Sequence, residues 1–380
     1  MSVPSAGSVL DDVAALERGD LSAMLRLVAG SGAQVREAAG AAAEAGLERL
    51  AQDGRPRAVV VAGVGASGLA GDLLAAVAGL SCPVPVVVHR GYGLPRWVGA
   101  ADVVCGVSAA GNTDETLSAV EQAVTRGCSV VGVGPEYSPL AELIARGRGV
   151  HVPVPAGRPA RASLWALSVP LLLAADALDL LTVGPADLAA AADRLDSVAE
   201  QCRPTSESFI NPAKQLALEL SGRLPMVWGA SPLAGVAAYR LQSQLAENAK
   251  YPCLAGVLPE VGHNQLATLD GVFGGKAPGR DRDIFADRAD EPDVVRLRLV
   301  LVRDTDEHPR PRHWAESCAA LVVARGIEVT ELVAEGDGPV ERFASLVGVP
   351  DFASVYLAVR NGIDPTSAGS VTDLLGGSTA

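Results

Sequence analysis

Short apolar runs alternate with longer amphipathic segments along most of the chain. The runs are rich in valine, which is typical of strands, whereas the segments between them repeat apolar residues at helical spacing. Strands this apolar are buried on both faces, so we expect a parallel sheet covered by helices on both sides. In the first half of the chain, the expected strands are residues 58–64, 84–90, 102–108, 129–134 and 150–155.

A second alternating block follows a helical stretch. Its expected strands are residues 224–230, 295–304 and 328–336, and its expected helices are residues 233–249, 313–326, 339–348 and 352–362. The pattern predicts an α/β protein with two α/β subdomains in tandem. The expected parts are an N-terminal helical segment (1–50), a first subdomain (51–185), a helical connector (186–222), a second subdomain (223–360) and a C-terminal tail (361–380).

The composition narrows the classes of partner. The net charge of −13 repels nucleic acid and anionic membrane surfaces, and no basic run offsets it. The longest apolar stretch, residues 164–181, is interrupted by Pro170, Asp176 and Asp179, so we expect a buried helix and no membrane span. The first residues do not resemble a signal peptide, and we therefore expect a cytoplasmic protein.

The stretch VVVAGVGASGLAGDLL contains a glycine pattern that invites a nucleotide-binding interpretation. Gly63, Gly65 and Gly68 follow an expected strand and open an expected helix, as in the G-x-G-x-x-G dinucleotide fingerprint. A dinucleotide site also requires an acid at the end of the second strand, where this chain has His89 and Arg90. Arg90 could meet a 2′-phosphate, so an NADP-linked enzyme stays a minor alternative.

Hydroxyl side chains point to a phosphate group instead. Ser67 follows the first expected strand, and Ser108, Gly111, Asn112 and Thr113 follow the third. Two such turns meet outside the carboxyl ends of a parallel sheet, where helix N-termini and hydroxyl groups can bind one phosphate without any lysine. The alternative is that Ser108 and Thr113 only cap helices and form turns.

The motifs resemble a known family. GVGASG and SAAGNTDET resemble the sugar-isomerase (SIS) fold, which has a glycine-rich serine loop followed by a Ser-x-Ser-Gly-Asn-Thr-x-Glu-Thr turn. LAENAKYPC, LPEVGHNQL, VPVPAGRPARASL and NGIDPT are similar to segments of the bifunctional phosphoglucose/phosphomannose isomerase family. The resemblance covers residues 55–366 and implies two SIS-type subdomains in tandem, each with a doubly wound, mostly parallel, flavodoxin-like sheet.

This resemblance implies aldose–ketose isomerisation of hexose 6-phosphates through a cis-enediol, in a homodimer, with no metal or redox cofactor. It makes Glu247 the proton-transferring base, buried against apolar walls. It makes His263 the ring-opening group, supplied by the partner subunit, and Arg161 the group that stabilises the enediolate. The residues expected to bind the substrate phosphate are Gly65, Ser67, Ser108, Asn112 and Thr113.

Without the family, each of the three catalytic candidates has a simpler interpretation. Glu247 would be a surface carboxylate paired with Lys250, His263 a loop histidine bonded to the backbone, and Arg161 a surface arginine at the start of a helix.

The sequence departs from the family pattern at two places. Ala109 and Ala110 replace the aromatic residue and the second serine of the Ser-x-Ser turn. The family also has a lysine about a dozen residues after the start of the Asp-Pro segment, whereas here that count leads from Asp364 to Leu375, and no lysine follows Lys276. Two alternatives therefore stay open: a sugar-phosphate-binding protein without turnover, and an isomerase of a different sugar phosphate.

Overall fold

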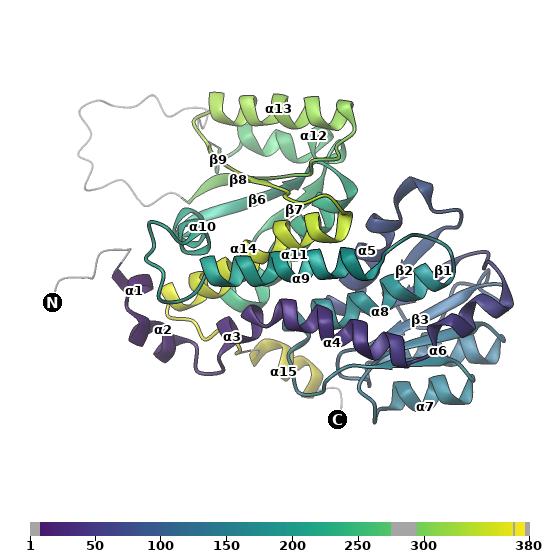
Figure 1. The fold of residues 1–380 in the computed structure, drawn as a ribbon. Helices are drawn as coiled ribbons and strands as arrows, with labels where there is room; N and C mark the ends of the chain where they lie inside the picture. The colour runs from purple at the N-terminus through teal and green to yellow at the C-terminus, as the bar shows by residue number, and fades with distance from the viewer. Residues whose placement is uncertain (1–7, 275–294, 368, 377–380) are drawn as a thin grey trace, which may run out of the picture. The chain divides into compact units, whose positions relative to one another are not determined.

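The computed structural model describes residues 8–274, 295–367 and 369–376 (Figure 1). These residues form two compact units, each built around one sheet. The first-sheet unit comprises residues 26–197 and 336–344. The second-sheet unit comprises the described residues up to Leu25, residues 198–335 in their described part, and those from Ser345 onward.

The first sheet is parallel, with the strand order β2-β1-β3-β4-β5. This is the doubly wound, flavodoxin-like order that the sequence predicts, and it confirms the expected fold class. The strands are β1 (Val59–Ala62), β2 (Val86–His89), β3 (Val103–Val107), β4 (Ser129–Gly134) and β5 (Val150–Pro153). Every residue of β1 and β3 is buried, because the helices on both faces exclude water from the central strands.

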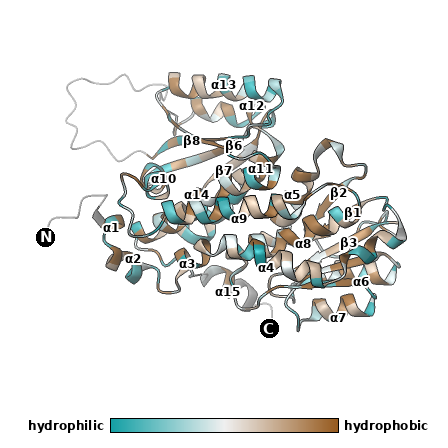
Figure 2. Ribbon diagram, viewed as in Figure 1, coloured by the Kyte–Doolittle hydropathy of each residue, from teal (hydrophilic) through white to brown (hydrophobic). Residues whose placement is uncertain are grey.

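Helices cover both faces of this sheet. Val60, Val104 and Val130 pack against α6 and α7 in one apolar cluster, while α5, α8 and α4 pack together on the other side. The helices of this unit are α4 (Ser31–Glu44), α5 (Ala66–Ala78), α6 (Asp114–Thr125), α7 (Pro139–Arg146), α8 (Leu164–Ala177) and α9 (Pro185–Gln201). Helix α8, the expected buried helix, is apolar around most of its circumference (Figure 2).

The second sheet is also parallel, in the order β7-β6-β8-β9. Its strands are β6 (Arg223–Gly229), β7 (Leu254–Val257), β8 (Arg296–Arg303) and β9 (Glu328–Val333). Strand β7 is not among the expected strands, because this edge strand has only four residues and contains Ala255 and Gly256, which are not typical of strands. The helices include α10 (Pro212–Leu220), α11 (Pro232–Ala249), α12 (Glu260–His263), α13 (Pro309–Ala324) and α14 (Pro339–Arg360).

The sequence predicts two helices in this region, whereas helix α14 is continuous and passes through Pro350. Among the described residues, this is the one helix long and apolar enough to span a membrane, and most of it is buried within the protein, which is typical of a core helix. The remaining helices are short: α1 (Ser8–Asp11), α2 (Val13–Gly19), α3 (Met24–Ala29), α15 (Gly369–Gly376), and the 3-10 turns η1 (Leu47–Asp53), η2 (Gly79–Ser81), η3 (Ala160–Ala162) and η4 (Gln265–Asp270).

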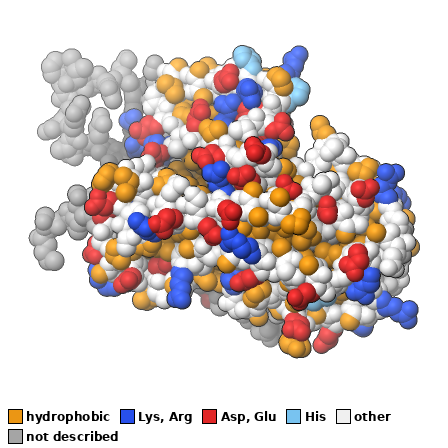
Figure 3. Space-filling model, viewed as in Figure 1, with side chains coloured by type: hydrophobic (Ala, Val, Ile, Leu, Met, Phe, Trp, Pro, Cys, Tyr) orange, Lys and Arg blue, Asp and Glu red, His pale blue; other side chains and the backbone are white. Residues whose placement is uncertain are grey.

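The two units cross the expected linear boundaries. Residues 26–50 belong to the expected N-terminal segment, yet they group with the first sheet because α4 packs on α8. The expected connector divides near residue 198, and residues 336–344 return to the first-sheet unit. On the face shown in Figure 3, acidic and basic side chains are interspersed, and that face carries no continuous basic surface.

Candidate active site

The loops after β1 and β3 meet at the switch point of the first sheet. Strands β1 and β3 are neighbours, but the chain continues from β1 to one side of the sheet and from β3 to the other. A crevice forms at such a point, outside the carboxyl ends of the strands. A Cβ atom on Gly63 would lie 3.1 Å from the Val107 carbonyl oxygen, so the backbones of the two loops are in contact there.

Glycine is required at the turn between β1 and α5. Gly65 precedes α5 with φ +57° and ψ −130°, a conformation that residues with a Cβ rarely adopt. A Cβ on Gly68 would lie 2.8 Å from the Gly63 carbonyl oxygen, so this glycine allows the helix to approach the strand closely. The turn places Ser67, which is buried, in the first turn of α5.

The turn after β3 is organised by hydroxyl groups. The Ser108 Oγ and Thr113 Oγ1 atoms are 2.8 Å apart, and the Gly111 backbone N–H donates to Ser108 Oγ at 2.9 Å. Gly111 has φ +73°, which favours glycine. Ser108 is buried, Thr113 is half-buried and Asn112 is exposed, so the turn presents polar groups from the buried floor to the surface.

The two helices that begin at this switch point have no side-chain cap. Gly65 precedes α5, and Thr113 precedes α6 without a capping hydrogen bond from its side chain. By contrast, Ser138 caps α7, Asn211 caps α10 and Ser231 caps α11. The capping alternative therefore does not describe Thr113, although Ser108 does form the turn.

An anion at this point would meet the backbone N–H groups of two helix N-termini. The acidic residues Asp114 and Glu115 in the first turn of α6 reduce this attraction.

Arg90 directly follows the edge strand β2 of the first sheet and pairs with α5. Its Nη2 atom forms a hydrogen-bonded ion pair with Asp72 of α5. Burial raises the pKa of the Asp72 carboxyl, while the Arg90 charge acts in the opposite direction. The pairing of Arg90 with Asp72 gives it a structural role and weakens the NADP alternative.

Arg161 lies in η3, which packs beside α5 in the same unit as the hydroxyl turn. The η3 turn is fixed by Gln34 of α4, whose Nε2 atom donates to the Ala162 carbonyl oxygen at 3.0 Å. Gln34 is 1% exposed. No sequence pattern indicates this role of Gln34, because it lies in an alanine-rich helix 128 residues away from this turn.

The corresponding point of the second sheet carries two buried acidic side chains, one of which is paired with arginine. It lies between β6 and β8, where Ser231 Oγ donates to Asp304 Oδ2 at 3.2 Å. The Asp304 backbone N–H donates to Glu307, whose carboxylate is buried against Arg303. With a capped helix and two buried acids, this point is poorly suited to a phosphate group.

Glu247 lies near the end of α11 and is exposed in the single chain, not buried as expected. Lys250 ends the helix in the left-handed conformation with φ +53°, and its Nζ atom donates to the Glu247 carbonyl oxygen at 2.7 Å. The lysine thus satisfies a terminal carbonyl group of the helix.

The helix that carries Glu247 is fixed by buried polar contacts to α14. Arg240 donates two hydrogen bonds of 3.0 Å to Asp351, and both side chains are buried. Two turns further along α11, Asn248 Nδ2 donates to Ser354 Oγ at 2.9 Å. These contacts lie on one face of α11 and were not expected from the sequence.

His263 is the last residue of α12, directly after β7, and is exposed. Its ring packs on Trp314 of α13 with the ring centroids 5.0 Å apart and a tilt of 44°. The next residue, Asn264, donates from Nδ2 to Glu260 Oε1 at 2.9 Å.

Within one chain, Glu247 and His263 lie toward opposite ends of the strands of the second sheet. Helix α11 starts at the carboxyl end of β6 and runs toward the amino ends of the strands, so Glu247 lies about 22 Å along the helix from the carboxyl end of β6. The chain then returns through β7, and His263 follows the carboxyl end of that strand. The first sheet brings its expected phosphate-binding residues together, whereas the second separates these two residues.

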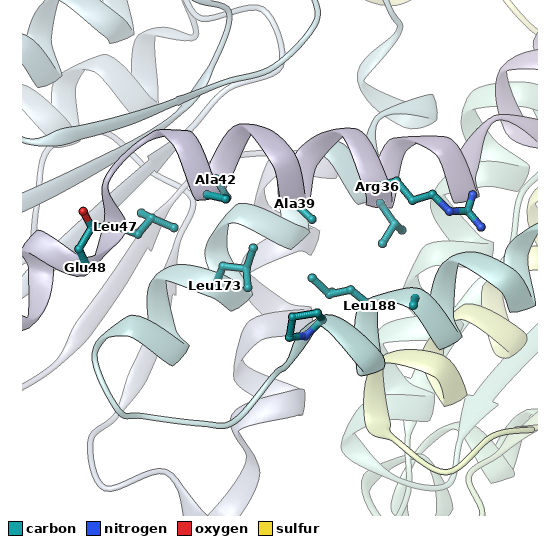
Figure 4. A pocket seen from close by; sticks show the side chains of 11 residues that line it. Arg36, Ala39, Ala42, Leu47, Glu48, Leu173 and Leu188 are labelled. Atoms are coloured by element: carbon teal, nitrogen blue, oxygen red, sulfur yellow. The ribbon is translucent and has the colours of Figure 1, made fainter.

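An apolar groove of about 470 Å³ lies elsewhere in the first-sheet unit, between α4, α8 and α9 (Figure 4). Its walls include Leu173 and Leu188, and its charged lining residues are Arg36 and Glu48. Arg36 is engaged by Asp193 and Asp196. A sugar site needs convergent polar groups, which this groove does not provide. Within the described ranges, no three His, Cys, Asp or Glu side chains gather to hold a metal ion.

Comparison with solved structures agrees with this architecture. A glucose-6-phosphate isomerase of Chlamydia trachomatis superposes with a TM-score of 0.71 at 13% identity, covering 98% of this chain and 84% of that one. This likeness shows a shared fold.

Two curated relatives extend over most of the chain. A bifunctional phosphoglucose/phosphomannose isomerase of Caldicellulosiruptor bescii is 29% identical over 308 residues, which are 81% of this chain and 85% of the relative. A protein of the same name from Aquifex aeolicus is 27% identical over 321 residues, which are 84% and 89% of the two chains. Residues 209–375 match the family described as bacterial phospho-glucose isomerase C-terminal SIS domain. The chain is thus similar over most of its length to bifunctional phosphoglucose/phosphomannose isomerases, and its residues 209–375 match the C-terminal SIS domain of the bacterial phosphoglucose isomerases.

Proposed function

We propose that the protein interconverts hexose aldose and ketose 6-phosphates, with glucose 6-phosphate and mannose 6-phosphate giving fructose 6-phosphate through a cis-enediol. The observation that carries the proposal is the pair of uncapped helix N-termini around the Ser108–Thr113 hydroxyl pair at the first switch point. Helix N–H groups and hydroxyl donors are what a phosphate group needs. The names of the curated relatives supply the reaction.

In this proposal the first-sheet unit holds the substrate. Gly65 and Ser67 of the β1 loop and Ser108, Asn112 and Thr113 of the β3 turn bind the phosphate group. Arg161, in the turn beside α5, places a positive charge near the enediolate oxygen, where charge develops in the transition state.

The proton transfer is assigned to the second half of the chain. Glu247 takes the proton from one sugar carbon and returns it to the next, while His263 assists ring opening. Because these two residues lie toward opposite ends of the strands of one sheet, we assign them to different subunits of a homodimer. The exposure of Glu247 in the single chain agrees with a carboxylate that is completed by a second subunit.

Incubation with fructose 6-phosphate in deuterated water, followed by NMR, tests the reaction. The wild type should form glucose and mannose 6-phosphates with deuterium at C2. Glu247→Gln should slow this exchange at least about a hundredfold. It should keep the stabilisation by ligand that a thermal shift measures. Glu316→Gln, an exposed change on α13, is the matched control and should be fully active.

A mixture of two inactive variants tests the assignment to different subunits. In a heterodimer of Glu247→Gln with His263→Asn, one site would combine both changes and the other would be native. Random mixing of subunits should then restore about a quarter of wild-type activity. If both residues acted from the same chain, no site would be native and the mixture would stay inactive.

A second function is favoured by the two departures from the family, Ala110 and the absence of a lysine after Lys276. The protein could then bind sugar phosphates without turnover, or isomerise a different one. Thermal stabilisation by fructose 6-phosphate with no deuterium exchange would support binding alone. Exchange in another sugar phosphate, but not in fructose 6-phosphate, would support the second possibility.

A further inference from the structure

The imidazole ring of His263 packs on one tryptophan side chain. His263 ends α12 and is exposed, and no described residue forms a hydrogen bond with either of its ring nitrogens. An exposed side chain without such bonds rotates among its staggered rotamers. The described ring contact of His263 is with Trp314 of α13, at 5.0 Å between the centroids. The orientation of the imidazole is therefore set by the indole of Trp314.

Gly262 allows this indole to lie directly against α12. A Cβ atom on Gly262 would lie 2.6 Å from Cζ3 and 2.7 Å from Cε3 of Trp314, closer than non-bonded carbon atoms approach. The six-membered ring of the indole thus lies against the Gly262 backbone as well as beside the imidazole of the next residue. A larger residue at position 262 would displace the indole from the helix.

The indole is itself fixed by the core of the second-sheet unit. Trp314 is half-buried and packs against the apolar cluster that also contains Leu258, Val261 and Ala315. Leu258 and Val261 lie on either side of the start of α12, and Ala315 adjoins Trp314 on α13. Because α12 and α13 pack against the same cluster, the indole has a defined place relative to the α12 backbone.

Gln265 fixes the chain on the other side of His263. Its Oε1 atom accepts a hydrogen bond from Trp228 Nε1 at 2.8 Å, and its Nε2 atom donates to the Ala255 carbonyl oxygen of β7 at 3.0 Å. Trp228 is fully buried in β6. The main chain at His263 is thus held by the buried Val261 before it and by Gln265 after it. Rotation of the side chain is the freedom that remains for the indole to restrict.

We propose that Trp314 is a positioning residue that orients the His263 imidazole for ring opening, with both ring nitrogens available to the sugar. A group that moves a proton must lie within hydrogen-bond distance of the sugar oxygen, so an imidazole held in one orientation is productive more often than a rotating one. Aromatic pairs favour their contact geometry about two- to tenfold. This role rests on the proposed function, whereas the ring contact does not.

Turnover of fructose 6-phosphate by single and double variants tests the role. Trp314→Leu keeps an apolar side chain and should lower kcat about three- to tenfold, with KM changed less than about twofold. Trp314→Phe keeps an aromatic ring and should recover most of this loss. In a His263→Asn background, Trp314→Leu should cause no further loss, because the indole acts through the histidine. Leu321→Ala, a partly exposed change on the same helix, is the matched control and should keep kcat.

NMR of protein with isotope-labelled histidine tests the contact without turnover. The signals that disappear in His263→Asn identify the His263 ring. Trp314→Leu removes the ring current of the indole, so the His263 signals should shift more than those of His89 and His151, which belong to the first-sheet unit. Gly262→Ala displaces the indole and should shift the His263 signals in the same direction.

Each part of the proposal has an outcome that overturns it. Unchanged His263 signals in Trp314→Leu would mean that the rings are not in contact, and unchanged kcat would mean that the contact does not serve turnover. A further loss of kcat in the double variant would assign the effect of Trp314 to general packing. An active wild type with any of these results would refute this role alone. A wild type that does not turn over fructose 6-phosphate, or a fully active His263→Asn, would refute the proposed function together with this role.

Discussion

The hydroxyl groups of Ser108 and Thr113 lie 2.8 Å apart at the carboxyl end of β3. Thr113 directly precedes α6, but its side chain does not cap that helix. The Gly111 backbone N–H already donates to Ser108 Oγ, so that oxygen is oriented by the turn itself. The arrangement leaves hydroxyl groups and helix N–H groups of β3–α6 beside the glycine turn of β1–α5.

Replacing Thr113 by valine should weaken substrate binding. The change removes one hydroxyl group and keeps the shape, and a hydrogen bond to a charged group is worth about 1.5–3 kcal/mol. We expect KM for fructose 6-phosphate to rise about ten- to a hundredfold with a smaller change in kcat, because the phosphate does not react. Thr125→Val, at the exposed end of the same helix, should leave KM unchanged. A KM that is equally insensitive to both changes would remove Thr113 from the site.

Two glycine-to-alanine changes should have opposite effects on stability. Gly65→Ala introduces strain at φ +57° and should lower the free energy of unfolding by about 1–3 kcal/mol, although a Cβ atom there would meet open space. Gly40→Ala, in the exposed interior of α4, should raise it by about 1 kcal/mol. Urea denaturation measures both. Equal stability of the Gly65 variant would mean that this turn does not need glycine.

Truncation of Asp351 should be much more damaging than truncation of Asp193. Asp351→Ala removes the buried carboxylate that pairs with the buried Arg240 guanidinium, which costs about 3–5 kcal/mol. Asp193→Ala removes an exposed partner of Arg36, which keeps Asp196, and should cost less than about 1 kcal/mol. Denaturant midpoints decide between them, and similar losses would contradict the account of α11 anchoring.

His151 should make the fold sensitive to mild acid. Its Nε2 atom faces the carbonyl oxygens of Gly134 and Pro135, which only accept, so Nε2 carries the proton of a neutral ring. Burial lowers the pKa of His151 below its ordinary 6.5, with the carbonyl contacts and Glu136 opposing the shift. The unfolded chain therefore binds more protons, and this stability is present above pH 6.5 and lost as the pH falls toward the lowered pKa.

Melting temperatures at pH 7.5 and 5.5 measure this dependence. His151→Gln should reduce the loss on acidification, while His313→Gln, an exposed change on α13, should not. The same loss in both variants would assign the acid sensitivity to other groups.

The first sheet could be predicted from the sequence because its central strands are uninterrupted apolar runs that end in glycine or serine turns. Strand β7 was missed because an edge strand with Ala255 and Gly256 lacks such a run. The continuity of α14 was missed because Pro350 normally ends a helix, and only the packing of the folded protein accommodates it.

The site was predictable only where a motif carries it. Residues of the two hydroxyl-bearing turns are close in sequence to strand ends, so topology brings them together. Gln34 and the Arg240–Asp351 pair act through contacts between segments more than a hundred residues apart, which no local pattern reveals. Glu247 is exposed because it lies near the end of helix α11, and the residues adjacent to it in the sequence do not predict this exposure.

A crystal structure of the protein with bound fructose 6-phosphate tests the central claim most directly. The account predicts the phosphate group within hydrogen-bond distance of Thr113 Oγ1 and of the backbone at the start of α5, on the first sheet. A phosphate group bound instead beside Ser231 and Asp304 of the second sheet, or away from both switch points, would contradict it.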